Sequence, residues 1–424
     1  MERRNFLKGS LGVLGSTMMT GVFSTKLFGS ALSKRKKLVV LFNHGGNDGI
    51  NMLVPYGDPY YNVIRPNLAI LPPDGSGSNA ISLGENGRHD GIDFGLHPSM
   101  SGLKNIWDDG NIAFMPATHC GKNPNRSHFY QFSFLGEGKY TTDTHTSDGY
   151  GWVSRYMNNK YLLGPQNMQT FDFTAGYFNV FNGWETLGMK NPASAYYGMS
   201  KTHATQYIDK VLPLGSDDSS VEAQVSKLQS FTISQIRSIE NYDFSSTPQN
   251  GALYPSSSLG TQLSQAATMF RNTPELEIIF INKGGWDTHS NQAVRHPTLL
   301  GDLSNSLYAF YTDMGTAMED TTVLVLSEFG RTAHENASSN SEGELIPGTD
   351  HGHAFCSFVI GGQINGGIYG GWPGLNPETQ LVSKRFLAEK VDYRDVISEC
   401  LSLLEGGDPD SAFQGFTRTP IGFA

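Results

Sequence analysis

The sequence predicts an α/β fold: a mostly parallel central sheet with helices on both faces. Short, continuously apolar segments, which are typical of strands buried on both faces, alternate with longer segments of helical periodicity. Several apolar segments lead into glycine-rich turns that carry His, Asp or Glu. Because strands joined by long crossovers usually run parallel, we expect these turns to meet at the sheet edge where α/β proteins bind ligands.

Five segments are predicted to be strands of this sheet, and they are residues 38–42, 112–116, 276–281, 322–326 and 355–360. The first, Leu-Val-Val-Leu-Phe, contains no polar residue, which indicates a strand covered on both faces. Apolar residues at helical spacing predict helices near residues 221–239, 259–270 and 300–314, and we expect a further helix to begin at His128.

The chain has 424 residues, which is longer than an average domain but within reach of one α/β core with insertions. We expect one domain over residues 34–424. Residues 135–250 are rich in Tyr, Asn, Gly and Ser, and we expect them to form an insertion or cap over the core.

Composition excludes several classes of protein. A hydrophobic fraction of 38% is enough for a large core, so most of the chain is not disordered. A net charge of −10 argues against a nucleic-acid partner, and no apolar run is long enough for a transmembrane helix. The three cysteines, Cys120, Cys356 and Cys400, allow one disulfide at most, although we expect them to be small buried residues.

The N-terminus resembles an export signal. Arg3 and Arg4 are followed closely by Phe-Leu-Lys and by a weakly apolar segment, a pattern typical of the twin-arginine pathway. We expect residues 1–33 to be a signal peptide, cleaved near Ala31 or Ser33, although a disordered basic tail is an alternative. The protein would then engage the twin-arginine translocase during export and reside in the periplasm or outside the cell. Because this route carries folded cargo, often with a metal or cofactor already in place, it mildly favours a metal site.

Chemically active side chains gather where the predicted strands end. His44 and Asp48 follow the first strand, whereas the residues near the later strands are Asp287, His289, Glu328, Asp350, His351 and His353. Carboxylate and imidazole donors together suit Zn²⁺, Mn²⁺ or similar ions. Each motif alone is equally explained by turn chemistry, but their shared placement at strand ends predicts a divalent metal site.

Five motifs occur in a fixed order: His-Gly-Gly-Asn-Asp-Gly, Asn-Arg-Ser-His-Phe, Gly-Gly-Trp-Asp-Thr-His, Ser-Glu-Phe-Gly-Arg-Thr and Gly-Thr-Asp-His-Gly-His. With the export signal and the later Asp-Tyr-Arg-Asp, this order resembles the bacterial family called domain of unknown function 1501. The resemblance runs from about Leu38 to the end of the chain. That family in turn resembles the alkaline phosphatase and sulfatase superfamily.

The resemblance implies a mixed, mostly parallel sheet and a one- or two-metal site for phosphate or sulfate esters. It implies that Ser127, at a helix start, is a nucleophile, and that the metal ligands come from Asp48, Asp287, His289, Glu328, and His351 or His353. The Asp-His-x-His motif itself offers Asp350 as a further ligand. Glu328 stands where the superfamily has an Asp followed by His, and no His follows it here. The formylglycine pattern of sulfatases is absent, because Cys120 lies two residues too early.

The leading hypothesis is therefore an exported hydrolase of phosphate or sulfate esters, acting on a small-molecule or saccharide ester with Zn²⁺, Mn²⁺, Ca²⁺ or Mg²⁺. Arg126 or Arg331 would hold the anionic group, and His128 or His119 would donate a proton to the leaving group. Two structural alternatives stay open: Ser127 as a helix N-cap and Arg331 in an ion pair.

A second hypothesis belongs to another class. The same fold could serve as a non-catalytic binding or assembly protein, with aromatic side chains stacking on sugars. The candidate aromatics are Trp152, Trp184, Tyr196, Tyr197 and Trp372, although aromatic residues more often pack in cores or turns. A third alternative is a purely structural metal.

Overall fold

The structure is a computed structural model that describes residues 35–121, 126–139, 148–165, 167–176, 178–194 and 221–424. The predicted signal peptide, residues 1–33, lies outside the described residues, as do Tyr196 and Tyr197. The export route therefore stays a prediction. Arg35–Ala424 group into one compact unit.

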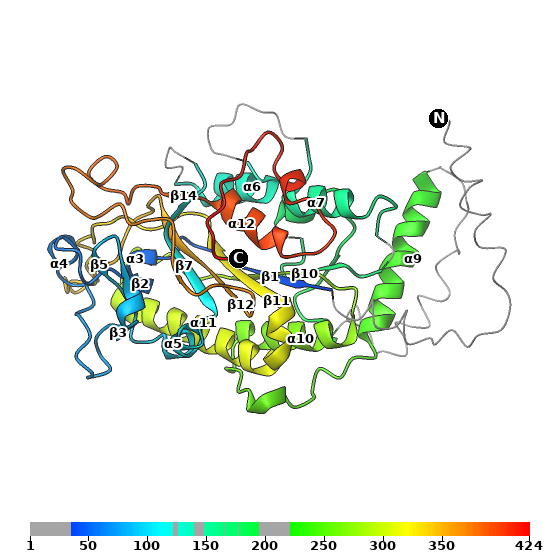
Figure 1. The fold of residues 1–424 in the computed structure, drawn as a ribbon, viewed down its shortest axis with the longest axis horizontal. Helices are drawn as coiled ribbons and strands as arrows, with labels where there is room; N and C mark the ends of the chain where they lie inside the picture. Colours follow the sequence, from blue (N-terminus) through cyan, green and yellow to red (C-terminus); the bar gives the residue numbers. More distant parts are fainter. Residues whose placement is uncertain (1–34, 122–125, 140–147, 166, 177, 195–220) are drawn as a thin grey trace. The chain divides into compact units, whose positions relative to one another are not determined.

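A mixed sheet of nine strands forms the centre of this unit (Figure 1). Its strands lie in the order β13–β7–β12–β11–β1–β10–β8–β9, and β14 also pairs with β7. The five long strands are β1 (Lys37–Asn43), β7 (Ile112–His119), β10 (Ile278–Lys283), β11 (Thr321–Ser327) and β12 (Phe355–Gly361). The short ones are β8 (Thr170–Asp172), β9 (Leu187–Gly188), β13 (Gly367–Ile368) and β14 (Val391–Asp392). All five predicted strands are confirmed.

The direction of the strands explains where the reactive residues gather. β1 runs parallel to both β10 and β11, whereas β12 runs antiparallel to β11 and to β7. β7 therefore points the same way as β1. The carboxyl ends of β1, β7, β10 and β11 share one edge with the amino end of β12, so the residues before β12 meet the residues that follow the other four. The predicted mostly parallel sheet is confirmed.

Both faces of the sheet carry helices, as predicted. In β1, Leu38 and Val40 pack into one apolar cluster, whereas Val39 and Leu41 pack into the other. The cluster of Val39 includes residues of α5 (Ser101–Asp108), α10 (Ser258–Asn272) and α11 (Gln292–Met314). The opposite cluster includes residues of α6 (His128–Glu137), α7 (Trp152–Lys160) and α12 (Tyr393–Ser402) (Figure 1).

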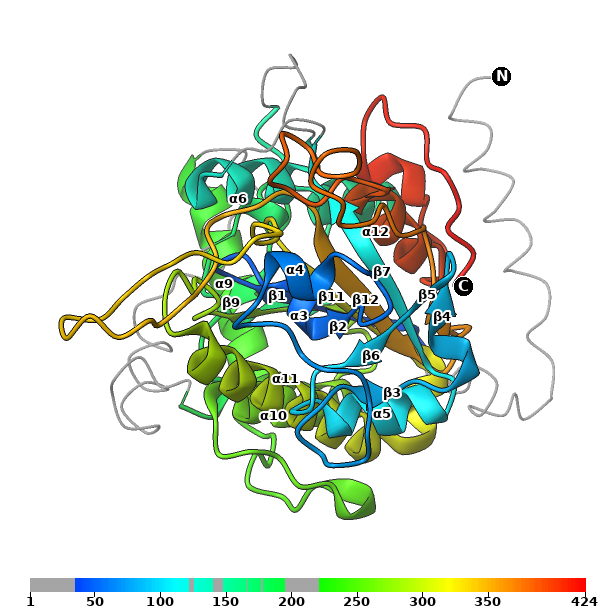
Figure 2. The same cartoon turned by 90° about the vertical axis from the view of Figure 1, so that its left-hand side faces the viewer.

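Smaller elements surround the edge at which β1 ends (Figure 2). They are α3 (Gly49–Met52), α4 (Tyr61–Ile64), a three-stranded sheet of β2 (Leu53–Val54), β6 (Gly95–Leu96) and β3 (Ile81–Ser82), and the pair β4 (Arg88–His89) and β5 (Ile92–Asp93). The helix α9 (Val221–Ile239) confirms the predicted helix in that region. Short 3₁₀ segments lie at Glu85–Gly87, Asn179–Phe181, Pro192–Ser194, Gln249–Gly251, Gly315–Asp320 and Pro409–Ala412.

Part of the segment predicted as an insertion or cap belongs to the sheet. β8 pairs with β10 and β9 pairs with β8. Residues within 135–250 therefore supply the two outermost strands on one lateral side of the sheet. The three cysteines are free and buried. Trp152, Trp184 and Trp372 are buried in the core as well, so they offer no exposed ring for stacking on sugar. No described helix combines the length and apolar composition that a bilayer crossing requires.

The close approach of α3 to β12 gives a test of the fold. A Cβ atom on Gly49 would lie 2.7 Å from the Cβ of Cys356, so we expect Gly49→Ala to destabilise the fold by about 1–3 kcal/mol. Gly301 in α11 is the matched control, because its added Cβ would meet nothing closer than 3.7 Å. Thermal unfolding followed by circular dichroism should show a lower midpoint for Gly49→Ala only. Equal midpoints for both variants would contradict this packing.

Candidate functional site

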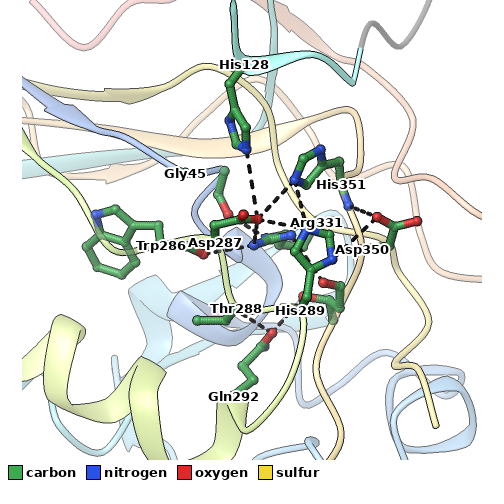
Figure 3. A network of polar contacts seen from close by, with 12 residues as sticks. Gly45, His128, Trp286, Asp287, Thr288, His289, Gln292, Arg331, Asp350 and His351 are labelled. Carbon is green, nitrogen blue, oxygen red and sulfur yellow. Dashed lines mark hydrogen bonds and ion pairs between the residues drawn. The ribbon is translucent and has the colours of Figure 1, made fainter. Parts of the chain in front are cut away.

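Loops from five strands meet at the shared edge of the sheet (Figure 3). The loop after β1 contacts the loop after β11 through a hydrogen bond from Gly45 N to Glu328 Oε1 of 2.8 Å. The segment before β12 contacts the loop after β10, since Thr349 N donates to the Thr288 carbonyl at 3.1 Å. The segment between β7 and α6 joins them through the Arg126 carbonyl, described below. The predicted convergence of distant loops is therefore present.

The Asp287 carboxylate is the centre of the cluster. Its Oδ1 lies 2.6 Å from Arg331 Nη2 and 2.9 Å from both His289 Nε2 and His351 Nε2, and His128 Nε2 lies 3.9 Å away. Partial burial raises the pKa of Asp287, but the hydrogen bond with His351 and the charge of Arg331 outweigh it and lower the pKa below its ordinary value. Asp287 is therefore a carboxylate anion at neutral pH.

Hydrogen bonds orient two of these imidazoles. His351 Nδ1 lies 2.8 Å from the Arg126 carbonyl oxygen, and His128 Nδ1 lies 2.5 Å from Glu328 Oε1. Both oxygens accept, so these partners assign the proton of each ring to Nδ1. In the neutral imidazole each Nε2 then carries a lone pair that faces Asp287, and only a ring that also carries a proton on Nε2 can donate the hydrogen bond to Asp287. A ring held this way by an oxygen on its far nitrogen is typical of metal-ligating histidine.

Glu328 supports this arrangement from below the surface. Its carboxylate is completely buried, and it accepts hydrogen bonds from Gly45 N at 2.8 Å and Ser327 Oγ at 3.2 Å. Glycine is required at position 45, because its φ is +123° and a Cβ there would lie 2.6 Å from Asp287 N. Glu328 Oε1 thus already has two donors, and Glu328 acts on His128 whether or not it also binds a cation.

A second group of donors adjoins the first. His289 Nε2 and His351 Nε2 are 3.0 Å apart, and His289 Nδ1 lies 3.6 Å from Asp350 Oδ1. Burial lowers the pKa of His289, which favours its neutral form. Asp350 accepts from the His351 backbone N–H at 2.8 Å, and its other oxygen pairs with Arg385 at 2.6 Å.

Three groups of described side chains can place donors around a single ion. They are His44, His128 and Glu328; His128, Asp287 and His351; and His289, Asp350 and His351. Tetrahedral ligands about 2.1 Å from a zinc ion lie roughly 3.4 Å from one another, which is close to the separations around Asp287. The donor chemistry therefore fits a divalent cation. His44 belongs to a group although it is not among the predicted ligands.

Asp48 does not fit its predicted role as a metal ligand. Both of its oxygens face the guanidinium of Arg65, with Oδ2 2.6 Å from Nη1 and Oδ1 3.0 Å from Nη2, and both side chains are fully buried. Gln292 also donates to Asp48 Oδ2. The carboxylate is therefore already neutralised, and Asp48 belongs to none of the three groups of described side chains that could hold a metal ion.

His353 also lies apart from the cluster. Its Nε2 is 3.3 Å from Glu389 Oε2, and the hydrogen bond from His353 lowers the pKa of Glu389 to about 2. The ring is almost fully buried and is in none of the three metal-binding groups. Of the two histidines that the sequence offered as the last ligand, only His351 reaches Asp287.

Arg331 forms the ion pair that was its structural alternative in the sequence analysis, with Asp287 as the partner. Its guanidinium is buried and donates to three carbonyls: Nε to Gly46 at 2.9 Å, Nη1 to Thr349 at 3.1 Å and Nη2 to Trp286 at 3.1 Å. With the bond to Asp287, all its nitrogens have partners. Arg331 ties three loops together and is not placed to clamp a substrate anion.

Ser127 and Arg126 lie at the start of α6, beside the cluster. Ser127 has extended backbone angles and is the N-cap residue, but its side chain makes no capping hydrogen bond to the first turn of the helix. Arg126 is exposed, and its guanidinium lies 5.6 Å from the centre of the Phe386 ring. Of the two predicted anion-binding arginines, Arg126 is the one open to solvent.

The Asp48–Arg65 pair predicts a specific dependence of stability on pH. Burial raises the pKa of Asp48, but the charge and hydrogen bonds of Arg65 lower the pKa by more than burial raises it. The net shift of the pKa is therefore downward. The pair therefore stabilises the fold above the unfolded pKa of roughly 4, and this contribution is lost as the pH falls. We expect Asp48→Asn to lower the free energy of unfolding by about 3 kcal/mol at neutral pH.

Denaturant unfolding of both proteins at a series of pH values checks this prediction. The difference between the wild type and Asp48→Asn should shrink steadily as the pH falls toward 3. A difference that stays constant over this range would show that folding does not lower the pKa of Asp48.

Comparisons with solved structures return bacterial proteins at low similarity. A member of the alkaline phosphatase superfamily from Vibrio parahaemolyticus shares 12% identity at a TM-score of 0.32, over 79% of this chain and 62% of that protein. A sulfatase from Pseudoalteromonas shares 11% at 0.33, over 81% and 66% of the two chains. An alkaline phosphatase from the Antarctic bacterium TAB5 shares 12% at 0.32, over 79% and 94%.

This chain thus spans about 62% of the length of the Vibrio protein. These TM-scores are too low to support a function for this chain, which must be inferred from its own side chains. A search of curated proteins gave no match. A family model does match: residues 223–422 fit the family described as "Protein of unknown function (DUF1501)". The similarity to this family that the ordered motifs predict is therefore confirmed over residues 223–422.

Proposed function

We propose that the chain is an exported, divalent-metal-dependent hydrolase of phosphate or sulfate esters. The observation that carries this proposal is the convergence of His128, His289 and His351 on a single oxygen of Asp287. Lone pairs and a negative charge at such short separations repel one another unless a proton or a cation lies between them. The cluster is also open to solvent, since the Asp287 side chain is 45% exposed.

The donor set favours particular ions. His128, Asp287 and His351 would hold the cation, with His289 and Asp350 beside them. Imidazole-rich sites suit Zn²⁺ or Mn²⁺, whereas Ca²⁺ and Mg²⁺ prefer sites made of oxygen donors. A bound cation would supply Lewis acidity to the ester oxygens. We therefore expect Zn²⁺ or Mn²⁺ to support activity better than Ca²⁺ or Mg²⁺.

The remaining predicted residues take up roles around this cluster. Ser127 precedes His128 at the amino end of α6, where the helix dipole favours an anion, and we assign it as the nucleophile. Arg126 would hold the phosphate or sulfate group. His128 uses Nδ1 for Glu328 and presents Nε2 to Asp287, so we assign it as a ligand rather than as the proton donor.

One observation favours the second hypothesis, a non-catalytic binding or assembly protein. Asp48 and Arg331 form hydrogen bonds within the protein, Asp48 with Arg65 and Arg331 with backbone carbonyls. The resemblance gives Asp48, and the leading hypothesis gives Arg331, an active role that these bonds do not favour. A sugar-stacking surface made of Trp152, Trp184 or Trp372 finds no support, because these rings are buried.

Metal content and turnover, measured on the same preparations, test the proposal. We expect purified protein loaded with Zn²⁺ or Mn²⁺ to hydrolyse an aryl phosphate or an aryl sulfate. Asp287→Ala and His351→Ala should each lose both bound metal and turnover, because each removes a donor from the central group. Metal content is measured by elemental analysis after dialysis.

His353→Gln is the matched control for His351→Ala. It removes an imidazole only two residues from His351, but this imidazole bonds Glu389 and does not reach Asp287. It should keep its metal and its turnover. Absence of bound metal in the purified protein would favour the non-catalytic binding alternative, whereas bound metal without turnover on either substrate would favour a purely structural metal. Metal content unaffected by Asp287→Ala and His351→Ala would reject the site altogether.

A further inference from the structure

The amide of Gln292 connects the two loops that carry the candidate ligands. Gln292 is the first residue of α11 and is 1% exposed. Its Oε1 lies 2.9 Å from Thr288 Oγ1 (Figure 3) and 2.6 Å from Thr349 Oγ1, and both hydroxyls donate to it. Thr288 stands between Asp287 and His289, whereas Thr349 immediately precedes Asp350. One carbonyl oxygen thus links both ligand-bearing loops.

The orientation of this amide is fixed by charge. Gln292 Nε2 donates to Asp48 Oδ2, and an ionised carboxylate can only accept. The amide nitrogen must therefore face Asp48, and the amide oxygen must face the two threonine hydroxyls. Arg65 keeps Asp48 ionised by pairing with both of its oxygens.

Arg65 is itself firmly held. It donates Nε to the Ala333 carbonyl at 2.7 Å, Nη2 to the Thr332 carbonyl at 2.9 Å, and Nη1 to Asn51 Oδ1 at 2.7 Å. The order of contacts is therefore Arg65 to Asp48, Asp48 to Gln292, and Gln292 to the two threonines. All the side chains in this sequence of contacts are buried, so water cannot readily replace any of these bonds.

We propose that Gln292, oriented by Asp48, is a positioning residue that sets the spacing of loops 284–290 and 348–353 and hence of the candidate metal ligands. Its contact with Asp287, His289 and His351 is indirect, through Thr288 and Thr349. Asp48 thereby acts on the site through a hydrogen-bond network rather than as a ligand. The consequence for metal binding rests on the function proposed above, whereas the positioning itself does not.

Three substitutions test the proposal. Gln292→Met keeps the length of the side chain but removes the amide, and Thr349→Val keeps the shape of threonine but removes its hydroxyl. Thr349→Ser restores the hydroxyl. The control is Ser304→Ala, a substitution in the same helix, α11, that removes a buried hydrogen bond from Leu103 N of α5, away from the loops.

The first readout is hydrogen–deuterium exchange of the metal-free proteins. Gln292→Met and Thr349→Val should speed exchange in loops 284–290 and 348–353, whereas Thr349→Ser and Ser304→Ala should leave these loops at the wild-type rate. Unchanged exchange in Gln292→Met overturns the proposal. Equal loosening by Ser304→Ala overturns it too, since the effect would then be general destabilisation.

The second readout is titration with Co²⁺, followed by its visible absorption. Loss of an outer partner of a metal ligand weakens binding by about 10- to 100-fold, and we expect this loss with Gln292→Met and Thr349→Val. Wild-type affinity and spectrum in both variants would overturn the link to the metal site. A wild-type protein that binds no Co²⁺ would instead reject the proposed function, and the exchange measurement would still decide the positioning role.

Discussion

A carboxylate buried at the end of a strand needs a partner that neutralises or solvates it, and this constraint organises the edge of the sheet. Three carboxylates converge there: Asp48, Asp287 and Glu328. Burying a charge without a partner costs several kcal/mol, so each must find a donor within the protein. Asp48 has Arg65, Asp287 has Arg331, and Glu328 has the imidazole of His128 with the backbone of Gly45.

The three solutions differ in what they leave open to solvent. The Asp48–Arg65 pair is fully buried, and it stabilises the loops around it. Asp287 contacts a buried arginine on one side and partly exposed imidazoles on the other, so part of its carboxylate is exposed to solvent. A partly exposed carboxylate with two imidazole nitrogens at 2.9 Å is a place where a cation could replace a proton.

Much of the fold was predictable, because the five long strands are short apolar segments and the helices have clear periodicity. The sequence also predicted that Asp287, His289 and His351 lie close together, since each follows or precedes a strand beside glycine, and the structure brings them together. Partners were harder to predict. Nothing near Arg65 marks it as the counter-ion of Asp48, because that contact depends on how α4 packs. Gln292 does not titrate and lies in no motif, so its contacts appear only in three dimensions.

The order of the strands has a consequence for biosynthesis. β1 is the first long strand to be synthesised, yet it lies between β10 and β11, pairing Leu38 with Ile278 and Lys37 with Thr321. Until those partners leave the ribosome, a strand whose residues 38–42 are all apolar has both of its edges unpaired, which is a hazard for aggregation. Such long-range pairing makes folding slow. The nascent chain should therefore depend on protection by chaperones until its final third has been made.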